Sequence, residues 1–118
     1  MIAGTVTDEG EPRVELPVAG RSWSAVIDTG FNGDLELPEA LRPFVNAHFR
    51  ARLAWILAGG RLVEEDTYSV DFPFDGQVVF AEASFVEEET ILVGTGLLRA
   101  YRLIVDFPAQ TVLLERGP

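Results

Sequence analysis

The chain has 118 residues, 47% of them hydrophobic, which is enough for one domain with a buried core. It has no cysteine, so neither a disulfide scaffold nor a thiol nucleophile is possible. All nine basic residues are arginine, and the net charge of −10 argues against nucleic acid or an anionic membrane as partner. We see no secretory signal, and the longest apolar run, Leu53 to Ala58, is too short to span a bilayer. We therefore expect a single domain over residues 1–118, located in the cytoplasm.

The first half of the sequence predicts strands joined by tight turns. Apolar residues alternate with other residues at Val14, Leu16 and Val18, the period of a half-buried strand. A turn at Ala19-Gly20-Arg21 leads into a strand at 22–27, whose shared face carries Trp23, Ala25 and Ile27. Pro38 suits the first turn of a helix that runs through Leu41, and Pro43 makes that helix short or irregular.

The second half continues the same pattern. We expect strands at 49–57, 62–70, 77–86, 89–93, 103–107 and 111–114. Turns are predicted at 58–61 and at Asp75-Gly76, and one or two helical turns at Thr95–Tyr101. The predicted fold class is a mainly β, closed, barrel-like domain with one or two short helices.

Asp28 stands out because it lies between an apolar run and a glycine. Ala25-Val26-Ile27 precedes it, and Thr29-Gly30 follows. A strand that buries its apolar residues and then turns sharply would hold this carboxyl in a poorly solvated place, ready for acid/base work. The alternative is a structural role, in which the carboxylate caps the turn through backbone N–H groups.

Two segments resemble the retropepsin-like aspartic proteases, the single-domain relatives of pepsin. In that family an apolar-apolar-Asp-Thr-Gly stretch is followed later in the chain by an apolar-apolar-Gly stretch that opens a short helix. The same marks occur here in the same order, as residues 26–30 and as Leu92-Val93-Gly94. The resemblance covers nearly the whole chain and looks closest to the small prokaryotic branch, in which Asp-Thr-Gly-Phe-Asn-Gly, here residues 28–33, is a common form.

The resemblance implies a homodimeric aspartic endopeptidase with no cofactor and no metal. Asp28 from each of two chains would activate a water, because one chain supplies only one Asp-Thr-Gly. Two such carboxyls would share one proton, a property carried over from the family. Thr29 matches a hydroxyl that braces the two loops across the axis, Gly30 a glycine close to substrate, and Gly94 a glycine that packs beneath the Asp loop.

A flap over the substrate is also implied by the resemblance. The segment from Ile56 to Arg61 occupies its place, and an ordinary hairpin turn is the equal alternative. The candidate substrate-binding and flap residues are Phe31, Ile56, Ala58, Gly59 and Gly60. Some positions depart from the family pattern. Phe31 stands where many retropepsins have alanine, Thr95-Gly96 replaces an Arg-Asn or similar pair, and the chain ends in a hairpin, so the terminal sheet of viral dimers is absent or rebuilt.

Other functions fit the sequence less well. His48 could belong to a Ser-His-Asp triad, but no serine lies in a Gly-x-Ser-x-Gly turn. Glu87-Glu88-Glu89 could bind a cation, although an acidic run is usually a solvated loop. The remaining alternative is a non-catalytic module that binds peptides or assembles on the same fold. The expected partners are a second copy of the chain and a peptide or protein substrate.

Overall fold

The computed structural model describes the backbone of residues 1–118 and every side chain except that of Trp55. Its ten strands are β1 (Ile2–Val6), β2 (Pro12–Val18), β3 (Arg21–Ile27), β4 (Leu35–Pro38), β5 (His48–Ile56), β6 (Leu62–Phe74), β7 (Gln77–Val86), β8 (Ile91–Val93), β9 (Tyr101–Asp106) and β10 (Thr111–Arg116). One 3-10 helix, η1 (Glu39–Phe44), follows β4. No helix in the described chain is long and apolar enough to cross a membrane.

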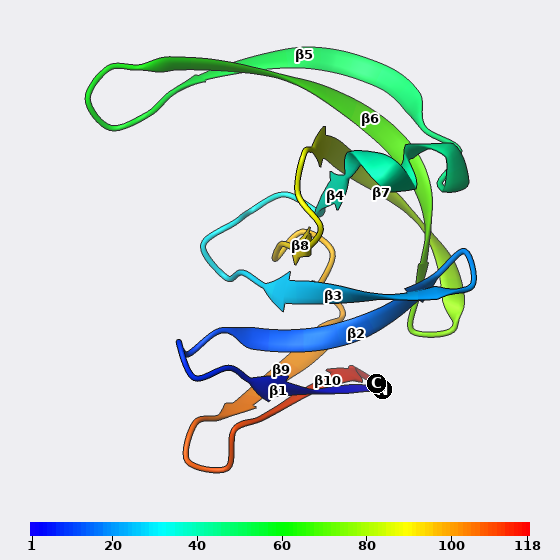
Figure 1. The fold of residues 1–118 in the computed structure, drawn as a ribbon, viewed down its shortest axis with the longest axis vertical. Coiled ribbons are helices and arrows are strands. Elements are labelled where there is room, and N and C mark those ends of the chain that lie inside the picture. The colour runs from blue at the N-terminus through cyan, green and yellow to red at the C-terminus, as the bar shows by residue number, and fades with distance from the viewer.

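All ten strands belong to one strongly curved sheet in the order β5-β6-β7-β4-β8-β3-β2-β1-β10-β9. Most neighbours are antiparallel, but β3 pairs with β8 and β4 with β7 in parallel. The mainly β class is as predicted, whereas closure into a barrel is not confirmed. The end strands β5 and β9 do not neighbour each other in the sheet, and Figure 1 shows them at opposite ends of the molecule.

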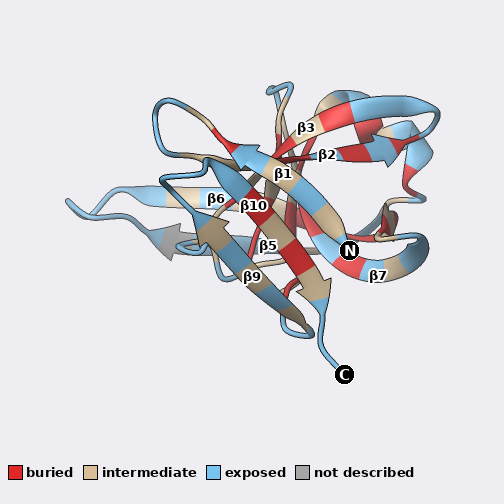
Figure 2. Cartoon of the chain, turned by 90° about the horizontal axis from the view of Figure 1, so that it is seen from below, coloured by how far each residue is buried: buried red, intermediate tan, exposed pale blue. Residues whose placement is uncertain are grey.

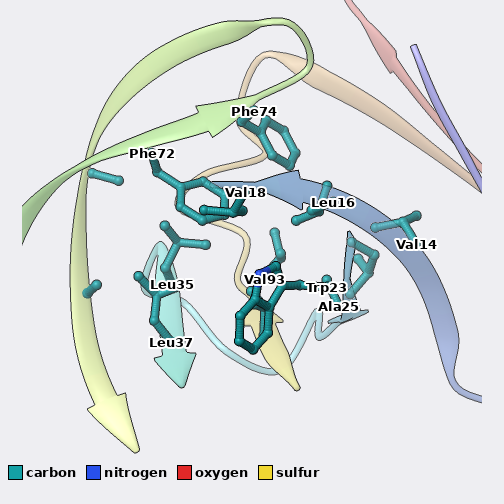
Figure 3. Close-up of a cluster of buried hydrophobic side chains, with 14 of the residues drawn as sticks. Val14, Leu16, Val18, Trp23, Ala25, Leu35, Leu37, Phe72, Phe74 and Val93 are labelled. Carbon is teal, nitrogen blue, oxygen red and sulfur yellow. The ribbon is translucent and has the colours of Figure 1, made fainter. Parts of the chain in front are cut away.

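The core lies inside the curve of this sheet. Alternation along β2 and β3 buries the residues that the sequence pattern selected, namely Val14, Leu16, Val18, Trp23, Ala25 and Ile27. They pack with Phe72 and Phe74 of β6 and with Leu35 and Leu37 of β4 (Figure 3). Figure 2 shows the resulting alternation of buried and exposed bands along the strands. Burying this apolar surface is the main stabilising contribution.

Two of the predicted turns have the expected geometry. Ala19 and Gly20 have φ values of 54° and 80°, and Asp75 and Gly76 have values of 54° and 76°. Two successive positive φ angles characterise the two-residue turns whose twist matches that of antiparallel strands. The β2–β3 and β6–β7 hairpins are therefore fixed by local sequence.

Several elements differ from the expectation. Strands β1 and β4 were not predicted, and β6 extends to Phe74 instead of ending at Val70. Residues 95–100 form consecutive turns instead of the expected helical turns over Thr95–Tyr101, and Tyr101 begins β9. Their i→i+3 bonds include Leu97 N–H to Gly94 O and Leu98 N–H to Thr95 O. The first N–H groups of this segment are held by another loop, so it does not wind into a regular helix.

Candidate functional site

Asp28 lies directly after β3, at the point where two buried strands run in parallel. Ile27 of β3 pairs with Val93 of β8, and both side chains are buried. The Asp28 N–H donates to the Val93 carbonyl oxygen at 2.9 Å, which continues this pairing by one residue. The carboxyl group therefore begins where the apolar core ends, and the residue is half-buried.

The backbone carbonyl and the side chain of Asp28 both close the turn that follows it. Gly30 N–H donates to Asp28 Oδ1 at 2.9 Å, and Phe31 N–H donates to the Asp28 carbonyl at 3.2 Å. The capping bond of the structural alternative is thus present, but it engages only one of the two carboxylate oxygens. Thr29 and Gly30 are exposed on the surface of the single chain.

The second motif is bonded to the loop that follows Asp28. The N–H groups of Gly94 and of the two residues after it donate to carbonyl oxygens of that loop: Gly94 to Asp34 at 2.9 Å, Thr95 to Phe31 at 2.8 Å, and Gly96 to Gly33 at 3.0 Å. The Thr95 hydroxyl adds a bond to the Phe31 carbonyl at 3.3 Å. At Thr95-Gly96 this chain therefore binds the loop through backbone groups and one hydroxyl.

Gly94 lies in direct contact with the same loop. A Cβ at this position would overlap the Gly33 carbonyl oxygen and would come within 2.6 Å of the Phe31 ring. Only a residue without a side chain allows this approach. The two motifs are thus joined by close packing as well as by hydrogen bonds.

A cleft of about 690 Å³ opens beside this loop. Its walls come from the loop and start of β4 at residues 31–35, from the β5–β6 hairpin, from β7 at residues 82–84, and from Gly96 and Arg99. Asp34 ties two of these walls together, because its Oδ2 accepts the Glu82 N–H at 2.9 Å. Phe31 lines the cleft, whereas Asp28 does not.

The β5–β6 hairpin projects well beyond the rest of the sheet (Figure 1). Its tip is closed by a bond from Leu57 N–H to the Arg61 carbonyl, and Gly59 and Gly60 have φ values of 93° and 79°. Ile56 and Ala58 are exposed at this tip and do not line the cleft. The part of the hairpin nearer the sheet, including Leu53, forms a cleft wall.

Glu36 is a charged residue near the site that the sequence analysis did not single out. It lies in β4 between the buried Leu35 and Leu37, half-buried on the other face of the sheet. Burial raises the pKa of its carboxyl, and the negative charges of Glu65, Glu88 and Asp28 raise it further. The sequence feature that could have identified Glu36 is a glutamate between two apolar residues, soon after the Asp-Thr-Gly turn.

The rival sites find little support in the geometry. His48 is exposed on β5, paired in register with Ser69 of β6. Among the side chains that the structure describes, no group of three or more histidine, aspartate and glutamate residues is placed to hold a metal ion, and this includes Glu87-Glu88-Glu89.

No family model and no curated protein matches the sequence. Among solved structures, the fold is similar to a retropepsin-like aspartic protease from Rickettsia conorii, at 14% identity and a TM-score of 0.66, over 95% of this chain and 87% of that one. It is also similar to a foamy viral protease-reverse transcriptase bound to an RNA/DNA hybrid, at 19% identity and a TM-score of 0.59. The fold is likewise similar to a second foamy viral protease-reverse transcriptase structure, bound to double-stranded DNA, at 19% identity and a TM-score of 0.57.

The comparisons differ in how much of each chain they cover. The two viral comparisons cover 85% and 83% of this chain, but only 14% and 17% of those longer chains. At these identities the likeness establishes the fold. The fold of this protein is retropepsin-like, as the two sequence motifs predicted.

Proposed function

We propose that this chain is an aspartic endopeptidase that acts as a homodimer, with one Asp28 carboxyl from each copy. The observation that carries the proposal is the setting of Asp28. It ends a buried parallel strand pair, lies in an Asp-Thr-Gly turn, and belongs to a loop bonded to the second motif, in a retropepsin-like fold.

In this proposal the second carboxyl comes from a second copy of the chain. Among the described side chains, no other carboxyl group is hydrogen-bonded to Asp28, whose Oδ1 accepts from Gly30 N–H. Glu36 interacts with Asp28 only through its charge. Thr29 and Gly30 are exposed in the single chain, which leaves the turn accessible for an isologous contact around a two-fold axis.

In this arrangement a water lies between the two carboxyls. The ionised Asp28 removes a proton from the water, whose oxygen attacks the peptide carbonyl carbon. The protonated Asp28 of the second copy donates its proton to the carbonyl oxygen, giving a neutral tetrahedral intermediate. The first Asp28 then returns its proton to the departing nitrogen while the second Asp28 takes a proton from a hydroxyl of the intermediate, so the C–N bond breaks and the pair again holds one proton. The substrate would bind as an extended strand beneath the β5–β6 hairpin, which acts as a lid.

A non-catalytic peptide-binding module is the second candidate. One observation favours it, namely that Asp28 is not among the residues that line the cleft of about 690 Å³. A protein of this kind would keep the groove and the lid without turnover.

The test compares Asp28→Asn with a matched control, Asp106→Asn. Asparagine keeps the size of the side chain and an oxygen for the Gly30 N–H, but it removes the ionisable proton. We expect peptide cleavage to fall by about 10³-fold or more for Asp28→Asn. The exposed Asp106 caps a distant turn through Ala109 N–H at 3.0 Å, so its asparagine variant should cleave normally. Wild-type activity in Asp28→Asn would assign the chemistry elsewhere, and a well-folded dimer inactive at every pH would favour the binding module.

A further inference from the structure

The lining of the cleft has more negatively charged than positively charged side chains. It contains three carboxylates, those of Asp34, Glu65 and Glu82, and one guanidinium, that of Arg99. Among the described side chains, neither Arg99 nor any of these three carboxylates takes part in an ion pair. Asp34 accepts the Glu82 N–H, whereas the Glu65 and Glu82 carboxylates have no such bond within the described residues. The cleft therefore presents two uncompensated carboxylates to whatever enters it.

Strand geometry brings these two carboxylates onto one face. Glu65 lies on β6 and Glu82 on β7, and β6 and β7 are antiparallel neighbours. Glu82 pairs with Ser69, and residues two apart on a strand share a face, so Ser69, Thr67 and Glu65 point to the same side as Glu82. The electrostatics agree with this placement, because the charge of Glu65 is one of the causes that raise the pKa of the nearby Glu36.

Ser84 gives an independent sign that a polar ligand group belongs here. It is only 7% exposed, it lines the cleft from the same face of β7 as Glu82, and its hydroxyl has no hydrogen-bond partner among the described residues. Its neighbour across the strands, Thr67, already donates to the Ala51 carbonyl at 3.1 Å. The hydroxyl oxygen is not sealed inside the protein, because Trp23 Nε1 is the one buried polar side-chain atom without a partner among the described residues, so a ligand donor in the cleft can reach the Ser84 oxygen and bond to it.

Apolar groups complete the shape of the site. Leu53, 39% exposed, faces the cleft from the β5–β6 hairpin, and the half-buried Phe31 faces it from the Asp28 loop. Long basic side chains combine an apolar stem with a cationic end, and this lining offers a partner for each part.

We propose that this cleft selects substrates that carry an arginine or lysine side chain, whose stem packs on Leu53 and Phe31 and whose cation binds between Glu65 and Glu82. The Ser84 hydroxyl accepts a further hydrogen bond from the same cation. The inference rests on the proposed function in taking the cleft as a substrate subsite. The net charge of −10 also attracts basic peptides to the protein.

The first arm of the test measures cleavage. A set of extended peptides in which one arginine occupies each position in turn is compared with a set carrying glutamine instead. At one fixed position relative to the cleaved bond, arginine should raise kcat/KM by about tenfold or more. The double variant Glu65→Gln with Glu82→Gln should lose this preference, so that kcat/KM for the arginine peptide falls to the value for the glutamine peptide. The control double variant, Glu9→Gln with Glu89→Gln, changes the net charge equally at exposed sites outside the cleft and should keep the preference.

The second arm measures binding without turnover. Fluorescein-labelled peptides of the two sets are titrated with the Asp28→Asn protein, and fluorescence anisotropy reports the Kd. The arginine peptide should bind about tenfold more tightly at low salt, with a smaller advantage as the salt concentration rises.

The two arms separate the failure of this inference from failure of the proposed function. Arginine-selective binding without any cleavage by the wild-type protein would support the subsite and overturn the peptidase. Asp28-dependent cleavage with equal use of arginine and glutamine would support the peptidase and overturn the subsite. Arginine preference that survives in the Glu65→Gln, Glu82→Gln protein would also overturn the assignment of these two residues.

Discussion

At the scale of single residues, Gly94 is where the site is most sensitive to substitution. A Cβ there would meet the backbone carbonyl oxygens of Gly33 and Phe31 as well as the Phe31 ring, and backbone atoms cannot turn aside as the end of a flexible side chain can. We expect Gly94→Ala to lower the free energy of unfolding by about 2 kcal/mol or more and to displace the Asp28 loop. Urea denaturation measures the first effect, and loss of peptide cleavage the second.

Gly10→Ala is the control for this substitution. Gly10 has a φ of 88°, and a Cβ added there would have no heavy atom within 4 Å, so alanine costs only backbone strain, about 1 kcal/mol. If Gly94→Ala is no less stable than Gly10→Ala, the two motifs are not held together by close packing.

Glu36 should give stability a pH dependence. The pKa of its carboxyl is raised in the folded protein by burial and by neighbouring carboxylates, so the folded state holds the proton more tightly than the unfolded state. This contribution to stability is complete below the ordinary glutamate range and is lost as pH rises through the raised pKa. We therefore expect Glu36→Gln to be more stable than the wild type at neutral pH and equal to it at low pH. Urea midpoints measured from pH 4 upward test this, and an equal difference at every pH would contradict it.

At the scale of elements, the β5–β6 hairpin beyond the cleft should contribute little to stability. Ile56 and Leu62 are 73% and 61% exposed, so these two apolar side chains of the tip bury little surface. Replacing residues 55–63 with Asn-Gly would close the shortened hairpin at the paired residues Ala54 and Glu64. We expect the thermal midpoint to stay within a few degrees of wild type, whereas cleavage should fall at least tenfold because the proposed lid is gone.

Two outcomes would contradict the prediction for the lid variant. Full activity would show that the tip does not act as a lid. Unfolding of the shortened protein would show that the tip belongs to the cooperative core.

Local signals decided which elements were predictable. The β2–β3 and β6–β7 hairpins followed from alternation and from Ala19-Gly20 and Asp75-Gly76, because both strand faces and both turn types are local properties. Strand β4 was missed because four residues next to a glycine turn carry little periodicity, and its partners β7 and β8 are distant in sequence. Barrel closure was expected from the fold class, and no local pattern specifies whether two end strands meet.

The candidate site was predictable to a similar degree. Asp28, Thr29, Gly30 and Gly94 were selected by motif alone, and the structure places them in two bonded loops. The carboxylates Glu65 and Glu82 could not be selected, because only the β6–β7 register brings them to one face. Ser84 is one of three mostly buried polar residues, and sequence does not reveal which hydroxyl lacks a partner.

At the scale of the whole molecule, net charge should oppose the proposed dimer. Each copy carries −10, so association brings like charges together over the entire surface. We expect the dimer dissociation constant at neutral pH to fall when the salt concentration rises from about 0.02 M to 0.3 M, because screening shortens the range of this repulsion. Sedimentation velocity at the two salt concentrations measures it, and a dimer that weakens with salt would indicate an interface held mainly by ion pairs.

The proposed active site adds a local form of the same repulsion, which links activity to pH. When both Asp28 carboxyls are protonated no base remains, and when both are ionised no acid remains and like charges meet at the two-fold axis. We therefore expect a bell-shaped profile of activity against pH with its optimum on the acidic side of neutral, and a dimer that dissociates more readily as pH rises.

Asp28→Asn removes the two charges at the axis and keeps the other acidic groups, so its dimer should lose less stability than the wild-type dimer between pH 5 and pH 8. Cleavage of a mixed peptide pool and dimer mass, measured on the same samples across pH, test both effects. A flat activity profile, or an identical pH dependence of the wild-type and Asp28→Asn dimers, would mean that Asp28 does not lie at the axis.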